Sequence, residues 1–202
     1  MGLPDKLAGL IAPPLCAVCA AGCDSGEALC LGCDRELRRG SSRPLKVPAV
    51  DQAWAARPYE GVARELVHAL KFRNLLPLAR RAAELIADEA PVALIEGPHV
   101  PVPPDPIRSA WRGFDSAELI AEELGPVSAC LRRSHGRRQV GRGRRDRLAA
   151  AIDVRAAGPV PPAVTLVDDV ATTGATLTAC ALALRTAGCE RIGAIVLAAA
   201  QA

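Results

Sequence analysis

The sequence predicts an α/β protein built on a mostly parallel sheet with flanking helices, preceded by a small cysteine-rich unit. From about residue 50, strand-like segments alternate with helix-like segments, which is typical of a parallel sheet covered by helices. Five of the eight cysteines fall within eighteen residues near the N-terminus. Half of the 202 residues are apolar, enough for one full-sized domain and an appendage. We therefore expect a cysteine unit with its linker at 1–45 and an α/β domain at 46–202.

The first half of the chain contains one strand and three helices by its residue pattern. The polar stretch at 35–44 predicts a short helix followed by a linker. Residues 51–59 predict a short strand that leads into a turn. Apolar residues recur at helical spacing in 61–74 and again in 76–90, so two consecutive helices are expected there.

The second half continues the alternation. Val100 and Val102 predict a strand that ends abruptly in prolines. A helix is expected at 111–124, with Asp115 or Ser116 as its N-cap. The remaining expectations are strands at 127–131, 164–167 and 191–200, a helix at 176–187, and an arginine-rich loop at 132–147.

Composition excludes several classes of protein. No run of about 20 apolar residues is present, so no membrane span and no membrane partner are expected. The N-terminus lacks the basic and apolar regions of a signal peptide, so a cytoplasmic location is expected. Net charge is only +3, which does not by itself indicate nucleic-acid binding.

The cysteine spacing predicts a structural zinc site. Cys16-x-x-Cys19 and Cys30-x-x-Cys33 are separated by ten residues. Each pair can turn both thiolates toward one metal, and four thiolates in a tetrahedron suit Zn²⁺. Because a unit this short has little apolar content, bound metal would supply its folding energy. Cys23 could replace one of the four or be a spare thiol. The other cysteines, Cys130, Cys180 and Cys189, are expected in the core.

Two adjacent acids and a hydroxyl-rich loop predict a sugar-phosphate site. Asp168 and Asp169 follow the apolar strand at 164–167, at the end of a parallel strand where ligands bind. The loop residues after them are Ala171, Thr172, Thr173, Gly174, Ala175 and Thr176. Uncovered backbone amides, hydroxyls and a helix N-terminus make this loop suited to a phosphate. The acids are better placed to accept hydrogen bonds from sugar hydroxyls or to hold Mg²⁺, and a ribose 5-phosphate fits this layout. Capping of the helix by Asp168 would explain only one acid.

The segment VTLVDDVATTGAT, residues 164–176, resembles the 5-phosphoribosyl-1-pyrophosphate (PRPP) signature of type I phosphoribosyltransferases. Nearly the whole chain is similar to the ComF family of zinc-ribbon proteins linked with natural competence. The other matching segments are Tyr59-Glu60-Gly61, Leu70-Lys71-Phe72, Val100-Pro101-Val102-Pro103, Arg112-Gly113-Phe114 and Arg137-Arg138-Gln139. The resemblance implies a type I phosphoribosyltransferase fold at 46–202 and a zinc ribbon at 1–45.

The resemblance also implies a reaction, displacement of pyrophosphate from the ribose of PRPP with Mg²⁺ bound. Asp168 and Asp169 would hold the ribose diol, and 171–176 would bind the 5-phosphate. Val102 and Pro103 would lie in the pyrophosphate loop.

Basic residues of the matching segments would bind the anionic substrate. Lys71 and Arg112 would be pyrophosphate ligands, or else surface charges. The loop with Arg137, Arg138 and Gln139 would close over the substrate; alternatively, it is a solvated basic loop or a nucleic-acid contact.

One departure from the family pattern concerns the acceptor. Members carry R-G-F-N-Q where this chain has Asp115 and Ser116 after Arg112-Gly113-Phe114, and no residue stands out as a general base. An alternative hypothesis is a non-catalytic PRPP- or nucleotide-binding module for DNA uptake or processing. Its ribbon and arginine-rich loop would contact single-stranded DNA or a helicase partner, although scarce aromatics weigh against stacking. A third hypothesis is a regulator that senses PRPP.

Overall fold

The computed structural model describes residues 14–24, 26–73, 76–105, 114–133 and 152–200, and a five-stranded sheet runs through them in the order β1-β2-β7-β6-β3. The strands are β1 (Arg43–Leu45), β2 (Gln52–Pro58), β3 (His99–Pro101), β6 (Ala163–Ala171) and β7 (Arg191–Ala199). Only β1 is antiparallel to its neighbour; the other pairs are parallel. The prediction of a mostly parallel sheet with flanking helices is therefore confirmed.

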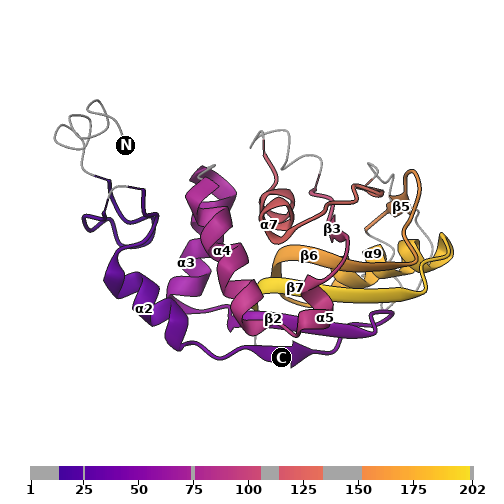
Figure 1. Cartoon of the computed structure of the whole chain (residues 1–202), viewed down its shortest axis with the longest axis horizontal. Coiled ribbons are helices and arrows are strands. Elements are labelled where there is room, and N and C mark those ends of the chain that lie inside the picture. The colour runs from indigo at the N-terminus through magenta and orange to yellow at the C-terminus, as the bar shows by residue number, and fades with distance from the viewer. Residues whose placement is uncertain (1–13, 25, 74–75, 106–113, 134–151, 201–202) are drawn as a thin grey trace, which may run out of the picture.

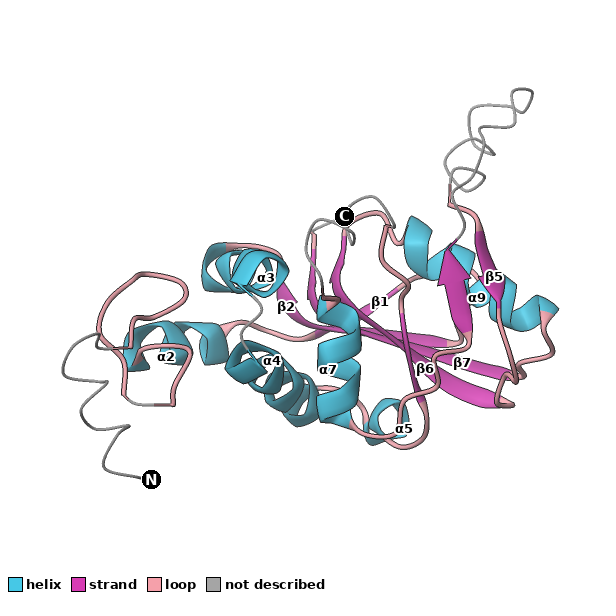
Figure 2. Cartoon of the chain, turned by 90° about the horizontal axis from the view of Figure 1, so that it is seen from above, coloured by secondary structure: helices cyan, strands magenta, loops and turns pink. Residues whose placement is uncertain are grey.

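Helices cover both faces of this sheet. The first face carries α3 (Gly61–Arg73), α4 (Leu76–Glu89), the short α5 (Val92–Ile95) and α7 (Ser116–Leu124). Figures 1 and 2 show α3, α4 and α7 together on one side of the strands. The second face carries α9 (Ala175–Thr186) and an antiparallel pair, β4 (Leu131–Arg133) with β5 (Val154–Ala156). None of the helices among the described residues has the length and apolar character that a membrane span requires.

Each face has its own apolar core. On the first face, Leu66 and Leu70 of α3 pack with Ile195 of β7. On the second, Leu184 of α9 packs with Leu166 of β6. Each such buried leucine contributes about 1.5–3 kcal/mol. The core also contains the three cysteines predicted for it, Cys130, Cys180 and Cys189.

The structure corrects several expected boundaries. Strand β6 continues four residues past the predicted end at 167, because parallel pairing with β7 outweighs the low strand propensity of aspartate. The predicted strand at 127–131 is mostly wrong, since β4 begins at Leu131 and Val127 forms only an isolated bridge. Part of the predicted linker forms the edge strand β1. Residues 134–147 of the predicted loop lie outside the described residues.

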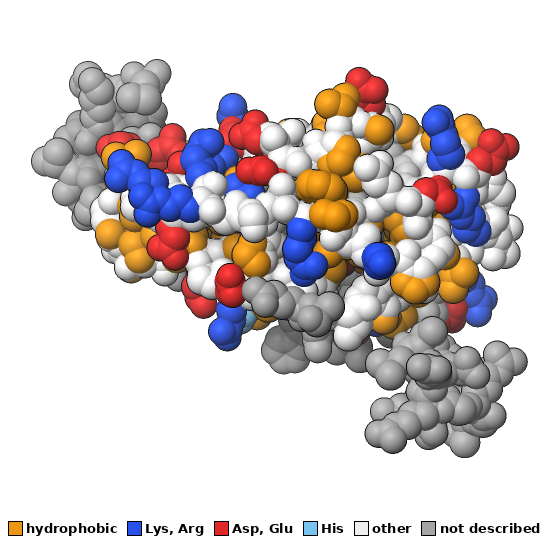
Figure 3. All heavy atoms as spheres, turned by 90° about the horizontal axis from the view of Figure 1, so that it is seen from below, with side chains coloured by type: hydrophobic (Ala, Val, Ile, Leu, Met, Phe, Trp, Pro, Cys, Tyr) orange, Lys and Arg blue, Asp and Glu red, His pale blue; other side chains and the backbone are white. Residues whose placement is uncertain are grey.

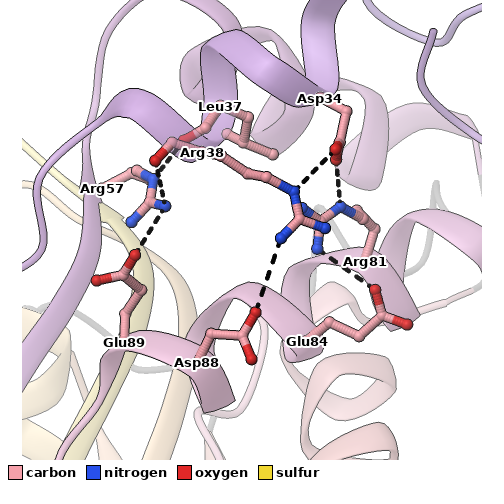
Figure 4. Close-up of polar contacts among 8 residues, drawn as sticks. All are labelled: Asp34, Leu37, Arg38, Arg57, Arg81, Glu84, Asp88 and Glu89. Carbon is pink, nitrogen blue, oxygen red and sulfur yellow. Dashed lines mark hydrogen bonds and ion pairs between the residues drawn. The ribbon is translucent and has the colours of Figure 1, made fainter. Parts of the chain in front are cut away.

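A helix of the cysteine-rich unit is joined to strand β2 and to helix α4 by two buried arginines, one from each element (Figure 4). This helix, α2 (Leu31–Arg39), ends against Arg57 of β2, which donates to the Leu37 carbonyl at 2.5 Å and to the Glu89 carboxylate at 3.0 Å. Arg81 of α4 donates to Asp34 of α2 at 2.6 Å. The Arg57 side chain therefore satisfies a carbonyl in the last turn of α2, a group that helix geometry leaves without a partner.

Candidate functional site

The two adjacent acids point to opposite faces of the sheet. Side chains alternate along a strand, and Leu166 belongs to the second-face core while Val167 belongs to the first. Asp169 contacts Lys71 of α3 and Ser116 of α7 on the first face, whereas the Asp168 charge acts on Cys180 of α9 on the second face. The pair therefore does not present two equivalent carboxylates to one ligand group.

Asp169 is held by a lysine and a serine from two first-face helices. Its side chain is 5% exposed, and its Oδ1 lies 2.9 Å from Nζ of Lys71 on α3. Its Oδ2 accepts a hydrogen bond from Ser116 Oγ of α7 at 2.5 Å. Both oxygens are thus engaged, and the interactions fix α3 and α7 relative to the sheet.

Asp168 is only partly buried and lies in a different electrostatic environment. Its Oδ1 accepts a hydrogen bond from the Asp169 backbone N–H at 2.8 Å. Burial, and then the neighbouring Asp169 charge, raise the pKa of Asp168 well above its ordinary value. A ligand hydroxyl or cation that approached this carboxylate would relieve the cost of its ionisation.

The loop after β6 turns sharply at a glycine and carries exposed hydroxyls at the start of a helix. Gly174 adopts a left-handed conformation with φ 70° and precedes the first residue of α9. The Thr173 hydroxyl accepts from the Ala175 amide at 3.4 Å. Thr172 and Thr173 are exposed, and amides of the first turn of α9 lack partners within the helix. The helix dipole adds partial positive charge at the same point.

A cleft of about 380 Å³ joins these elements. It lies beyond the carboxyl ends of three parallel strands, since Tyr59 follows β2, Val102 follows β3, and Thr172 follows β6. This is the position at which open α/β sheets bind ligands. Further lining residues are Lys71, Pro103, Pro104, Asp105, Phe114, Asp115, Ser116, Arg133, Asp168, Asp169, Val170 and Thr176.

The N-terminus of α7 forms one wall of this cleft. Asp115 caps the helix, because its Oδ1 accepts from the Ala117 amide at 3.0 Å, as predicted. Burial, followed by the charges of Glu118 and Asp169, raises the pKa of Asp115 to about 6. Asp115 and Ser116, where the chain departs from the pattern of the family that it resembles in sequence, therefore lie in the cleft itself.

Acidic groups outnumber basic groups among the described lining residues. Four carboxylates face two basic side chains there, and one basic group, Arg133, lies 3.5 Å from the Asp105 carboxylate. The other, Lys71, is paired with Asp169. A polyanion would be repelled from such a lining unless a divalent cation accompanied it. Carboxylate and hydroxyl oxygens are the donors that Mg²⁺ accepts.

The cleft brings together seven of the residues that the sequence singled out for the sugar-phosphate site, while Ala171, Thr173, Gly174 and Ala175 are not among its lining residues. Lys71, both acids, Val102, Pro103, Thr172 and Thr176 line it. Arg112, Arg137, Arg138 and Gln139 lie outside the described residues. The sequence did not indicate Arg133 as a cleft residue, because nothing in its run of arginines distinguishes it from the others. Asp115 was expected as a cap and as a departure from the R-G-F-N-Q pattern, and Tyr59 only as part of a matching segment.

Four cysteines come together at the other end of the molecule. The thiols of Cys16, Cys19, Cys30 and Cys33 all lie within 4.8 Å of one another, so they could hold a metal ion such as zinc. The Cys19 and Cys30 sulfurs are 3.6 Å apart, near the separation of about 3.8 Å that thiolates 2.3 Å from a tetrahedral ion would have. All eight cysteines, each of them a described residue, are free of disulfides.

Local geometry selects these four thiols and leaves Cys23 aside. The first pair lies on a turn closed by the Ala20 amide, which donates to the Cys16 carbonyl at 3.0 Å. Burial raises the pKa of Cys16, but backbone amides, those of Cys19 and Cys30 foremost, outweigh it and lower the value to about 6. Cys23 instead donates to the Ala21 carbonyl, and its thiol is not among the four that lie within 4.8 Å of one another.

Comparison of the sequence with protein-family models and with curated proteins gave no match. The cleft and the thiol cluster therefore provide the structural indications of function.

Proposed function

We propose that the chain is a phosphoribosyltransferase-like protein of the ComF type that binds PRPP together with Mg²⁺. One observation carries the proposal: the acids of β6, Thr172 and Thr176 on either side of the turn before α9, and the loop after β3 line a single cleft at strand ends. This cleft combines sugar-hydroxyl acceptors with phosphate donors. The resemblance of residues 164–176 to the PRPP signature agrees with the arrangement.

In the proposed complex, the turn at 171–176 binds the 5-phosphate through backbone amides and hydroxyls. Asp168 accepts hydrogen bonds from the ribose diol, while Asp169 holds Lys71 and Ser116 in position. The pyrophosphate lies along residues 102–105, near Arg133. When bound, Mg²⁺ would neutralise phosphate charge and so help pyrophosphate to leave. The reaction is displacement of this pyrophosphate by an acceptor nucleophile.

The cysteine unit is proposed to be a structural zinc ribbon. Its four thiols have the separations that a tetrahedral ion needs, and only Cys16 and Cys33 among them are buried. Zinc there would stabilise the turn and the start of α2 and take no part in the chemistry of the cleft.

Calorimetric titration with PRPP tests the proposal. Wild type should bind PRPP in Mg²⁺ and lose most of its affinity in EDTA, because the acidic lining repels an unaccompanied polyanion. Thr172→Val, which keeps shape and removes one hydroxyl, should weaken binding about tenfold. Thr186→Val, at the far end of α9 where its hydroxyl donates to the Leu182 carbonyl, is the matched control. Equal heats with PRPP and with buffer would contradict the proposal.

The alternative of a DNA-binding module has weaker support on the face of the molecule drawn in Figure 3. Figure 3 shows one face of the molecule, on which basic, acidic and apolar side chains are interspersed. A backbone-tracking nucleic-acid site would need a continuous basic stripe. PRPP binding without pyrophosphate release in the presence of any acceptor would favour this alternative.

A further inference from the structure

Burial divides the four clustered thiols into an inner pair and an outer pair. Cys16 and Cys33 are 1% and 8% exposed, whereas Cys19 is exposed and Cys30 is half-buried. The oxidation of a sulfur depends on how readily an oxidant in solution reaches it. The outer pair, Cys19 and Cys30, is therefore the part of the cluster that such an oxidant meets first.

We propose that the outer pair is an oxidation site, at which a peroxide converts Cys19 and Cys30 into a disulfide and the ribbon gives up its metal. The inference rests on the zinc ribbon proposed above and is independent of the cleft and of PRPP. It gives the cysteine unit a redox-sensitive role in addition to a structural one.

The outer sulfurs are placed for such a bond. The Cys19 and Cys30 sulfurs lie 3.6 Å apart, and a disulfide bond of about 2.05 Å requires them to approach by roughly 1.5 Å. Cys30 is the N-cap residue of α2, but its side chain makes no capping hydrogen bond. Its thiol can therefore turn toward Cys19 without removing a hydrogen bond from the start of the helix.

The turn that carries Cys19 favours this cysteine as the first sulfur to react. The next residue, Ala20, has φ 59°, a left-handed conformation that is unfavourable for a residue with a Cβ atom. Such a conformation persists where the surrounding structure imposes it. The Ala20 amide donates to the Cys16 carbonyl at 3.0 Å, and binding of Cys16 and Cys19 to one ion would hold the same turn. Loss of Cys19 from the ligand set would let the turn relax.

The step balances with hydrogen peroxide as the oxidant. The Cys19 thiolate attacks one peroxide oxygen, and the O–O bond breaks with its electron pair on the other oxygen, which leaves a sulfenic acid at Cys19. The Cys30 thiolate then attacks the Cys19 sulfur, and the S–O bond breaks with its electron pair on the departing hydroxide. The two sulfurs lose two electrons and the peroxide gains them. Both peroxide oxygens take protons from solvent and end as water.

Oxidation would leave only the two inner thiols for a metal ion. Structural zinc takes four ligands, so the ion would be released while the disulfide keeps the two segments joined. The first turn of α2 contains Cys33 and Asp34, and Asp34 Oδ1 lies 2.6 Å from Nε of Arg81 on α4. A change at the thiols would therefore reach α4 through this ion pair.

The test treats the full chain, loaded with zinc, with hydrogen peroxide. Zinc release is followed with a coloured chelator, and the remaining thiols are counted in the unfolded protein with a thiol reagent. Cleavage after Glu27 separates the peptide that contains Cys19 from the peptide that contains Cys30. Mass spectrometry of these peptides then shows which cysteines a disulfide joins.

Two variants make the test specific. Cys19→His removes the first sulfur and offers the ion an imidazole, a ligand that structural zinc sites also use. Cys23→Ser is the matched control, because the Cys23 thiol donates to the Ala21 carbonyl and is not one of the four clustered thiols.

We expect wild type to lose two of its eight thiols as it releases its zinc, and to join the two peptides through Cys19 and Cys30. Dithiothreitol with zinc should reverse both changes. Cys19→His should release zinc at least about tenfold more slowly than wild type, and Cys23→Ser within about twofold of it.

Zinc that stayed bound in excess peroxide, or a disulfide that joined other cysteines, would overturn the inference and leave the zinc ribbon intact. If Cys19→His did not hold zinc, the disulfide map of wild type would decide alone. Wild type that held no zinc but still formed the Cys19–Cys30 disulfide would instead overturn the zinc ribbon. Absence of both would overturn the two together.

Discussion

The opposite orientation of the two β6 acids predicts opposite effects of two identical substitutions. Asp169→Asn leaves the Lys71 ammonium without its counter-ion. That pair is 2.9 Å long, with side chains 23% and 5% exposed. Losing one partner costs about 3–5 kcal/mol for a fully buried pair and about 0–1 kcal/mol for an exposed one. We therefore expect Asp169→Asn to lower the free energy of unfolding by about 2–3 kcal/mol at pH 8.

Asp168→Asn should instead raise the free energy of unfolding at pH 8. The folded-state pKa of Asp168 is raised by burial and by Asp169, so in wild type the unfolded chain ionises more readily than the folded one. Wild type therefore loses stability as the pH rises from the unfolded pKa through the folded pKa. The asparagine variant does not lose stability in this way. The difference between its free energy of unfolding and that of wild type should vanish below about pH 4.

Urea denaturation followed by far-UV circular dichroism at pH 8 and pH 4 measures both effects. The double variant Lys71→Met/Asp169→Asn completes a cycle: it should cost less than the sum of its single changes, because it leaves no unpaired charge. If Asp168→Asn and Asp169→Asn shifted stability at pH 8 in the same direction and by similar amounts, the two carboxylates would occupy equivalent environments. The assignment of one acid to each face of the sheet would then be refuted.

Three further outcomes follow from the buried arginine, the thiol cluster and the cleft acid. Arg57→Met should lower the free energy of unfolding, measured by urea denaturation, by about 3–5 kcal/mol, because the Arg57 side chain is only 2% exposed. Arg38→Met, at a side chain that is 55% exposed, should lower it by less than about 1 kcal/mol. Equal costs would contradict a special role for Arg57. Wild type should contain one zinc ion per chain, measured by atomic absorption. Cys16→Ser should lose this ion, whereas Cys23→Ser should retain it. Asp115→Asn should raise the free energy of unfolding at pH 8 by at most about 3 kcal/mol, because the folded pKa of about 6 exceeds the ordinary 3.8, and the gain should fade as the pH falls from 6 to 4.

The sequence predicted those elements whose residue pattern and local chemistry agree. Helices α3 and α4 follow apolar residues at helical spacing, and Asp115 caps α7 as an N-cap aspartate should. The two C-x-x-C pairs lie where turns bring their thiols together. In these places the information is local, because hydrogen bonds and packing form within a few residues of the pattern.

Long-range pairing decided the features that the sequence did not predict. Aspartates are poor strand residues, so an apolar run followed by two acids indicates a strand that ends. In the fold, Asp168 pairs with Val196 of β7, and the strand continues to Ala171. Pairing with a strand that is distant in sequence thus places both acids within β6 rather than after its end, so their side chains point to opposite faces of the sheet. The same holds for β5, whose three residues gain their strand conformation from β4.

The cysteine unit is stabilised by the elements around it, which its own sequence does not reveal. Its low apolar content suggested that metal alone would hold it together. Yet Cys16, Leu29 and Leu37 are buried in the same apolar core as the side chains of α3 and α4, and Arg57 of the sheet donates to the last turn of α2. Metal at the thiols would therefore stabilise one end of α2, while the sheet stabilises the other. Removal of metal should loosen the turn at 16–19 first and leave the last turn of α2 attached to β2.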